Sequence, residues 1–125
     1  NQQRDQLHHI LHALPLAQRW PRLTIAQRKR LLARPQWDDA WQLLQALAHD
    51  PRWALVTDAI RADLPALLAQ PVAPLPLVTG DDLIALGLKP GPDFKAWLEK
   101  VYDAQLEGRI HTTAEAQAWL RSQLG

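Results

Sequence analysis

Apolar residues recur along this chain every three or four positions, which is the spacing of one face of an α-helix. The pattern is clearest at Trp37, Trp41, Leu44 and Ala48, which share a single face at about 3.6 residues per turn. Capping residues, glycines and prolines separate one such segment from the next. We therefore predict an all-α fold of about seven helices in two packed clusters, joined by a proline-rich linker.

Residues 1–70 are predicted to form a helical body with a basic N-terminal third. A first helix is expected to end before Pro15, and a connection over residues 15–23 follows it. Thr24 opens a capping box and begins a short basic helix that ends near Ala33. Pro35 is expected to begin the next helix, and Asp50-Pro51 to cap and begin the one after it. Pro65 is expected to kink that last helix or to split off a last turn over residues 66–70.

Residues 71–76 contain three prolines and are predicted to form a rigid linker to a tail over residues 77–125. Two capping boxes and one proline suited to the first position of a helix predict three helices in this tail, the first and second of which are joined by a tight turn. The first helix is capped by Thr79, carries Leu83, Ile84 and Leu86 on its apolar face, and ends at Gly87. The others run from about Pro92 to Glu107, before Gly108, and from the Thr112 cap onward, with Trp119, Leu120 and Leu124 buried.

The composition favours helices and excludes several classes of protein. Leu, Ala and six Trp supply much of the 47% apolar content. The absence of cysteine excludes disulfides and thiolate metal sites, and no apolar run is long enough to cross a membrane. We expect a cytoplasmic protein without a membrane partner. Because the chain has no methionine, we also expect it to be a piece of a longer protein.

The net charge of +1 conceals an uneven distribution along the chain. Residues 1–35 hold seven Lys and Arg against one Asp, a net charge of +6, whereas residues 36–125 hold seven against twelve Asp and Glu, a net charge of −5. A basic end of this kind fits the binding of a polyanion. It fits equally well a surface that docks on an acidic neighbouring domain.

Residue types that serve in catalysis occur here without the partners that catalysis needs. The chain has a single serine, Ser122, and no glycine-rich phosphate loop. Asp81 and Asp82 open a helix, where carboxylates cap the first turn, and Asp50 after His49 is interpreted in the same way. We predict no catalytic residue and no metal site. The histidines that lack a recognisable further metal ligand are interpreted as a solvated or partner-facing patch: His8, His9 and His12.

The turn that follows Gly87 allows two interpretations. Lys89, Pro90 and Gly91 aim backbone N–H groups and one ammonium at the same point, which suits a phosphate contact. The same turn suits a plain connection between two packed helices. Among the tryptophans, Trp20 lies between prolines and among arginines, and it is the one expected to face a ligand or a missing domain.

Three motifs of the tail resemble a known enzyme family. They are Thr79-Gly-Asp-Asp-Leu83, Gly87-Leu-Lys-Pro-Gly-Pro92 and Asp103-Ala-Gln-Leu-Glu-Gly108. At this spacing they resemble the C-terminal helical region of bacterial tRNA nucleotidyltransferases, the CCA-adding enzymes and poly(A) polymerases. The resemblance extends upstream to residues 28–35 and 37–39. The chain departs from the family in lacking the Gly-Ser motif and paired aspartates of the catalytic head, and Leu43-Leu-Gln-Ala-Leu47 lacks the aspartate of an HD-type domain.

The resemblance implies a non-catalytic piece of a nucleotidyltransferase that holds tRNA or another RNA by its backbone. Magnesium and nucleotide triphosphates are then expected only in the missing N-terminal catalytic domain, and we expect no cofactor in this piece. The missing domain is itself an expected partner. The alternative is a structural or protein-interaction module that docks on that domain or on a second copy. The residues expected to contact RNA are Arg28, Lys29, Arg30, Arg34, Lys89, Pro90, Gly91 and Lys95.

Overall fold

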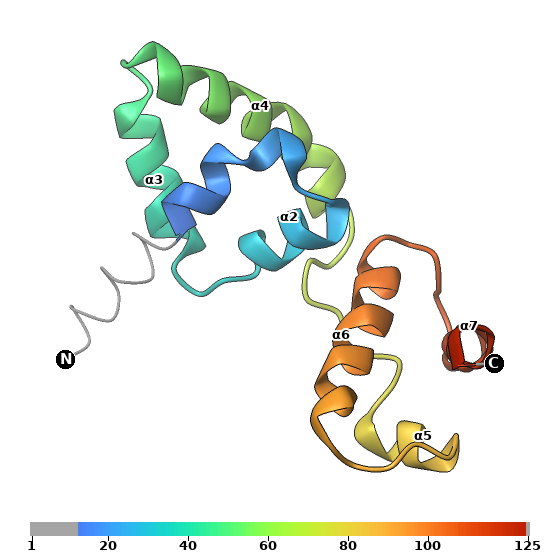
Figure 1. The fold of residues 1–125 in the computed structure, drawn as a ribbon. Helices are drawn as coiled ribbons and strands as arrows, with labels where there is room; N and C mark the ends of the chain where they lie inside the picture. The colour runs from blue at the N-terminus through green and yellow to red at the C-terminus, as the bar shows by residue number, and fades with distance from the viewer. Residues whose placement is uncertain (1–12, 125) are drawn as a thin grey trace. The chain divides into compact units, whose positions relative to one another are not determined.

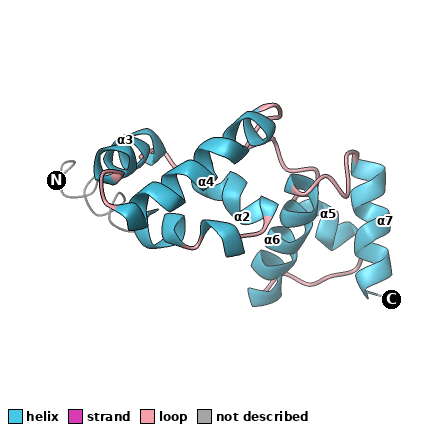
Figure 2. Cartoon of the chain, turned by 90° about the horizontal axis from the view of Figure 1, so that it is seen from above, coloured by secondary structure: helices cyan, strands magenta, loops and turns pink. Residues whose placement is uncertain are grey.

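The computed structural model describes residues 13–124, and the regular structure in this range is entirely helical (Figures 1 and 2). The predicted all-α class is therefore confirmed. The chain divides into two compact units, Asn1–Ala73 and Pro74–Gly125, which we call unit 1 and unit 2. Each unit has a hydrophobic core of its own. Among the described helices, none combines the length and the apolar character needed to cross a membrane.

Unit 1 is built from short helices whose starts are set by local caps. Its elements are a helical stretch over residues 13–18, the 3-10 turn η1 (Trp20–Arg22), α2 (Ile25–Leu32), α3 (Trp37–Leu47) and α4 (Pro51–Leu68). Thr24 caps α2, because its N–H donates to Gln27 Oε1 at 2.8 Å and its Oγ1 accepts from the Gln27 N–H at 3.1 Å. Both bonds are those of the predicted capping box.

The cap of α4 is also the predicted one. Asp50 accepts a hydrogen bond from the Arg52 N–H at 2.9 Å, and Pro51 occupies the first turn. The Arg52 side chain donates to the same carboxylate, and this contact, together with the backbone bond, holds the pKa of Asp50 below its usual range. Asp50 therefore serves as a helix cap, as the sequence indicated.

Two prolines of unit 1 lie inside helices, and the prediction for Pro15 was wrong. Residues 13–18 are helical, so Pro15 lies inside a helix instead of following one. Pro65 lies within α4, which runs to Leu68 as one helix, so of the two outcomes expected there the separate last turn does not occur. A proline inside a helix forfeits one backbone hydrogen bond. The flanking Ala17 and Leu67 are buried in the core, and we attribute the tolerance of both prolines to this packing.

Trp20 is a core residue, which contradicts the expectation that it faces a ligand or a missing domain. Its side chain is 0% exposed, and its indole N–H donates to Asp63 Oδ2 at 2.8 Å. The η1 turn packs against α4 and thereby directs the ring inward. A tryptophan can be buried when its N–H finds an acceptor, and Asp63 supplies one from α4.

Unit 2 consists of α5 (Gly80–Ala85), α6 (Pro92–Leu106) and α7 (Thr113–Leu124), with α6 packed against both of the others (Figure 1). Ile84 is 50% exposed and Leu124 is 38% exposed, so the prediction that both lie on buried faces was wrong. Ile84 follows Leu83, and consecutive helical residues point about 100° apart. The core cluster of unit 2 consists of Val78, Leu83, Val101, Ala104, Ile110, Ala116 and Leu120.

The start and the end of α5 match the sequence motif residue by residue. The Asp82 carboxylate accepts from the Thr79 N–H at 2.8 Å and from the Thr79 hydroxyl at 3.1 Å, which confirms its capping role. At the other end Gly87 has a φ of 96°. Its N–H donates to the Ile84 carbonyl at 2.9 Å, and the Leu88 N–H donates to the Leu83 carbonyl at 3.1 Å. These two bonds define a Schellman motif.

Replacement of Gly87 by Ala is expected to destabilise unit 2 by about 1–2 kcal/mol, because a left-handed backbone crowds any Cβ atom. Gly91→Ala is the matched control: its φ of 172° is ordinary extended backbone, and the nearest heavy atom to an added Cβ lies 4.0 Å away. That variant should stay within about 0.5 kcal/mol of wild type. Urea unfolding followed by circular dichroism measures the change in the free energy of unfolding for both variants. Equal losses of stability in Gly87→Ala and Gly91→Ala would contradict the Schellman motif.

Candidate nucleic-acid interface

Two of the four predicted contact residues of unit 1 are engaged inside the fold. Lys29 is only 8% exposed and lies on the buried side of α2. The Arg28 guanidinium donates to the Trp20 carbonyl at 3.2 Å and 3.0 Å, and it forms an ion pair with Asp63 at 3.4 Å. Arg28 also lies over the Trp20 ring, 5.1 Å from its centroid. This arginine therefore joins η1, α2 and α4.

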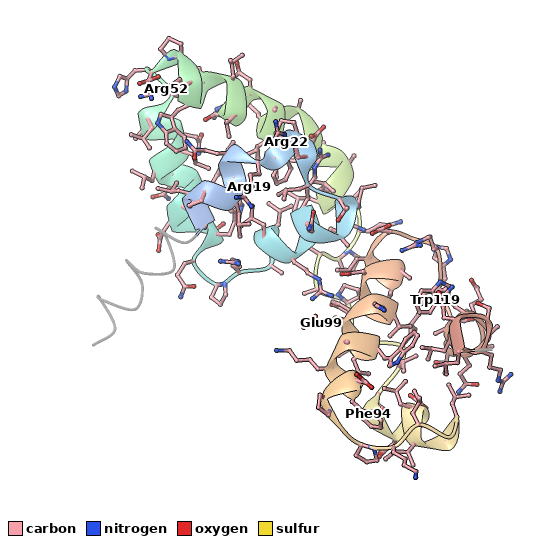
Figure 3. All side chains as sticks on the ribbon, viewed as in Figure 1. Arg19, Arg22, Arg52, Phe94, Glu99 and Trp119 are labelled. Carbon is pink, nitrogen blue, oxygen red and sulfur yellow. The ribbon has the colours of Figure 1, made fainter. Side chains whose placement is uncertain are left out.

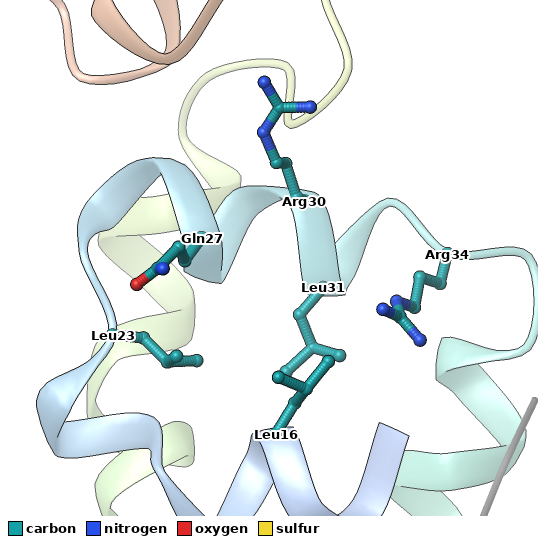
Figure 4. A pocket seen from close by; sticks show the side chains of 6 residues that line it. All are labelled: Leu16, Leu23, Gln27, Arg30, Leu31 and Arg34. Atoms are coloured by element: carbon teal, nitrogen blue, oxygen red, sulfur yellow. The ribbon is translucent and has the colours of Figure 1, made fainter. Parts of the chain in front are cut away.

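The other two, Arg30 and Arg34, are brought together at one hollow of about 180 Å³, which we call the α2 hollow (Figure 4). Arg30 is exposed and extends away from the leucines that line the hollow, whereas Arg34 is partly buried and its guanidinium lies nearer to them. The other lining residues are Leu16, Leu23, Gln27 and Leu31. The hollow thus combines an aliphatic wall with two positive charges.

The predicted contacts of unit 2 are all on the surface, at the start of α6. Lys89, Pro90, Gly91 and Lys95 are each exposed. Gly91 is the N-cap of α6 and has no side chain, so no N-cap side chain accepts a hydrogen bond from the N–H groups of the first turn. Asp93 lies in the same first turn and places a negative charge there.

Net charge distinguishes the two units. The sequence of unit 1 holds nine Lys and Arg against six Asp, a net charge of +3. Unit 2 holds five Lys and Arg against seven Asp and Glu, a net charge of −2. A phosphate therefore meets a more favourable average field at unit 1 than at unit 2.

Two further exposed arginines lie in unit 1, Arg19 at the end of the first helical stretch and Arg22 in η1 (Figure 3). The sequence pattern counted them in the basic end but did not mark them as contacts. The α2 hollow itself was also missed, because its leucines come from three separate segments: Leu16, Leu23 and Leu31. Each of them reads in the sequence as an ordinary core position.

The remaining candidates for chemistry have structural explanations or lie outside the described range. His49 Nδ1 lies 3.0 Å from the Ala46 carbonyl, and the neighbouring Asp50 caps α4. Between residues 13 and 124, no group of three or more His, Cys, Asp or Glu could hold a metal ion. The patch of His8, His9 and His12 falls outside the residues that the structure describes.

Part of the chain is similar to enzymes of known activity. Over 55 residues it is 40% identical to a CC-adding tRNA nucleotidyltransferase of Thermus thermophilus. The matched stretch is 43% of this chain and 13% of that protein. Over 64 residues it is 39% identical to an A-adding tRNA nucleotidyltransferase of Deinococcus radiodurans, covering 50% of this chain and 15% of that protein. The matches thus span only a small part of these curated relatives. No family model and no solved structure matches the chain.

Proposed function

We propose that this chain is a non-catalytic helical piece from the C-terminal part of a cytoplasmic tRNA nucleotidyltransferase-like protein. Its role is to bind the backbone of tRNA while a separate domain, with magnesium and nucleotide triphosphates, adds CCA or poly(A) to the 3′ end. The observation that carries the proposal is the similarity to two enzymes named for nucleotide addition to tRNA. The charges and exposures of the described residues indicate where such binding would occur.

In unit 1 the proposed contact narrows to the arginines at the rim of the α2 hollow. Arg30 and Arg34 both line it. A guanidinium is always charged and can donate two parallel hydrogen bonds to a phosphate. Arg28 is less suited to this role because Asp63 already compensates its charge. Arg19 and Arg22 extend the exposed positive charge of the same unit.

In unit 2 the proposed contact is the turn before α6. Lys89 and Lys95 supply charge, and the backbone at Pro90 and Gly91 supplies an approach without a bulky side chain. A helix N-terminus favours an anion. Asp93 and the net negative charge of the unit oppose that effect, so we assign this turn the smaller share of the affinity.

The proposal predicts that the affinity of the full 125-residue chain for tRNA falls steeply with salt. Each phosphate contact makes the slope of log K against log salt more negative by about 0.9 on a duplex. Contacts by Arg30, Arg34, Lys89 and Lys95 therefore predict a slope of about −3.6. Filter binding or fluorescence anisotropy at several salt concentrations measures it. Lys89→Ala should reduce the slope by about 0.9.

Binding that is absent, or that does not change with salt, would overturn the proposal. A control against the alternative role is size-exclusion chromatography of the chain without RNA. If the chain instead forms a stable dimer, or associates tightly with a catalytic domain of the same protein, while tRNA is not bound, then the docking-module interpretation is the better one.

A further inference from the structure

The α2 hollow has a shape and a chemistry that backbone binding does not use. Its wall is formed by Leu16, Leu23 and Leu31, and Figure 4 shows the three side chains directed toward one another from separate segments. Leu31 is fully part of the core, whereas Leu16 and Leu23 are only partly buried. An aliphatic surface is therefore accessible beside Arg30 and Arg34. A phosphate contact alone would need the arginines but not this surface.

The volume of the hollow fits a single ring. It measures about 180 Å³. For comparison, an engineered cavity of about 150 Å³ lined by aliphatic and aromatic side chains binds benzene. A six-membered planar ring is thus of a size that the α2 hollow can accept, while a helix or an extended strand is too large for it.

The charge of the hollow restricts the ring to one that is attached to an anion. Two of its six lining residues are arginines, and the other four are neutral. A guanidinium both pairs with phosphate and stacks on a flat π-system. A nucleotide joins a planar ring to a phosphate, so its ring can pack on the leucines while its phosphate pairs with an arginine.

We propose that the α2 hollow receives one unpaired nucleobase of a bound RNA, with an adjacent phosphate held by Arg34. This inference rests on the proposed function, since it assumes an RNA ligand. It adds that the chain distinguishes unpaired from paired RNA, because a base can enter the hollow only when it is free of its partner strand. An acidic peptide with a bulky apolar side chain has some of the same features, but it lacks the flat face that suits leucine and guanidinium together.

The test compares a short single-stranded oligouridylate with an abasic ribose-phosphate oligomer of the same length. Both carry the same phosphates, and only the first carries bases. The wild-type chain should bind the base-containing oligomer about tenfold more tightly, because one base face is then covered by apolar side chains. Leu23→Trp fills the hollow without changing the charge, and it should bring the two affinities together. Leu55→Trp is the matched control, since Leu55 is 75% exposed on α4 and does not line the hollow.

A second measurement keeps the test independent of the folding of Leu23→Trp. Methyl NMR of the wild-type chain should show shifts at the leucines of the hollow on addition of the oligouridylate, and no comparable shifts with the abasic oligomer. Equal, salt-dependent affinities for both oligomers would overturn the base site and leave the proposed function intact. Failure of both to bind, together with failure of tRNA, would overturn both. A wild-type dimer that Leu23→Trp dissociates would assign the hollow to a side chain of a second copy and would also overturn the base site.

Discussion

Replacement of Trp20 by Ala is expected to destabilise unit 1 by about 3–5 kcal/mol, the usual cost of removing a fully buried aromatic side chain. The ring is 0% exposed, so its loss opens a large cavity between η1 and α4. The Asp63 carboxylate also loses the indole N–H that lies 2.8 Å away. A unit of this size has only about 5–15 kcal/mol of stability, so the variant should be largely or partly unfolded. Urea unfolding followed by circular dichroism gives the change.

The control for this prediction is Trp20→Phe, which keeps one six-membered ring but removes the fused five-membered ring and its N–H. It should cost less than Trp20→Ala, because a smaller cavity is opened, but more than the roughly 1 kcal/mol of the lost hydrogen bond alone. Asp63 still pairs with Arg28 at 3.4 Å. The comparison also separates a core role from a ligand-facing one. If Trp20 faced a ligand, Trp20→Ala would weaken RNA binding and leave the midpoint in urea unchanged, which would contradict the structure.

The second large effect is expected for RNA affinity in the double variant Arg30→Gln/Arg34→Gln. Two lost phosphate contacts make the salt slope shallower by about 1.8. Taking the two proteins to bind equally at 1 M salt, the variant binds tRNA about 60-fold more weakly than wild type at 0.1 M. Gln keeps some hydrogen-bonding capacity but carries no charge. Fluorescence anisotropy with labelled tRNA measures the change, and thermal unfolding checks that both proteins are folded.

The matched control is Arg52→Gln/Arg61→Gln, which lowers the net charge of the same unit by the same amount. Arg52 pairs with Asp50 at 3.1 Å and Arg61 pairs with Asp58 at 3.3 Å, and neither lines the α2 hollow. Figure 3 shows Arg52 at the end where α3 leads into α4. A small loss of affinity in the control beside a large loss in Arg30→Gln/Arg34→Gln would locate the contact. Equal losses would show that only net charge matters.

Local features of this fold were predictable because their causes lie within a few residues. The Thr24 and Asp50 caps each depend on a partner two or three positions away. The same holds for the end of α5 at Gly87, where the bonding partners are Ile84 and Leu83. Helix type, most helix starts and the glycine stops could therefore be read from the sequence.

Features that depend on distant residues could not be predicted in this way. Trp20 is buried because Asp63, 43 positions later, accepts its N–H. Pro15 lies inside a helix because Ala13 and Ala17 pack into the core of unit 1, and the neighbouring sequence does not indicate that packing. Of the predicted contacts in unit 1, Lys29 lies on the buried face of α2, and Arg28 is held by Trp20 and Asp63, which are eight and 35 positions away.

The central claim, that the rim of the α2 hollow binds RNA phosphates, is tested most directly by one comparison of salt dependence. The affinity for tRNA is measured at several salt concentrations for the wild-type chain and for Arg30→Gln/Arg34→Gln. The structure predicts that the slope of log K against log salt becomes shallower by about 1.8 in the variant. Parallel lines for the two proteins would mean that these arginines do not contact phosphate, and they would contradict the claim.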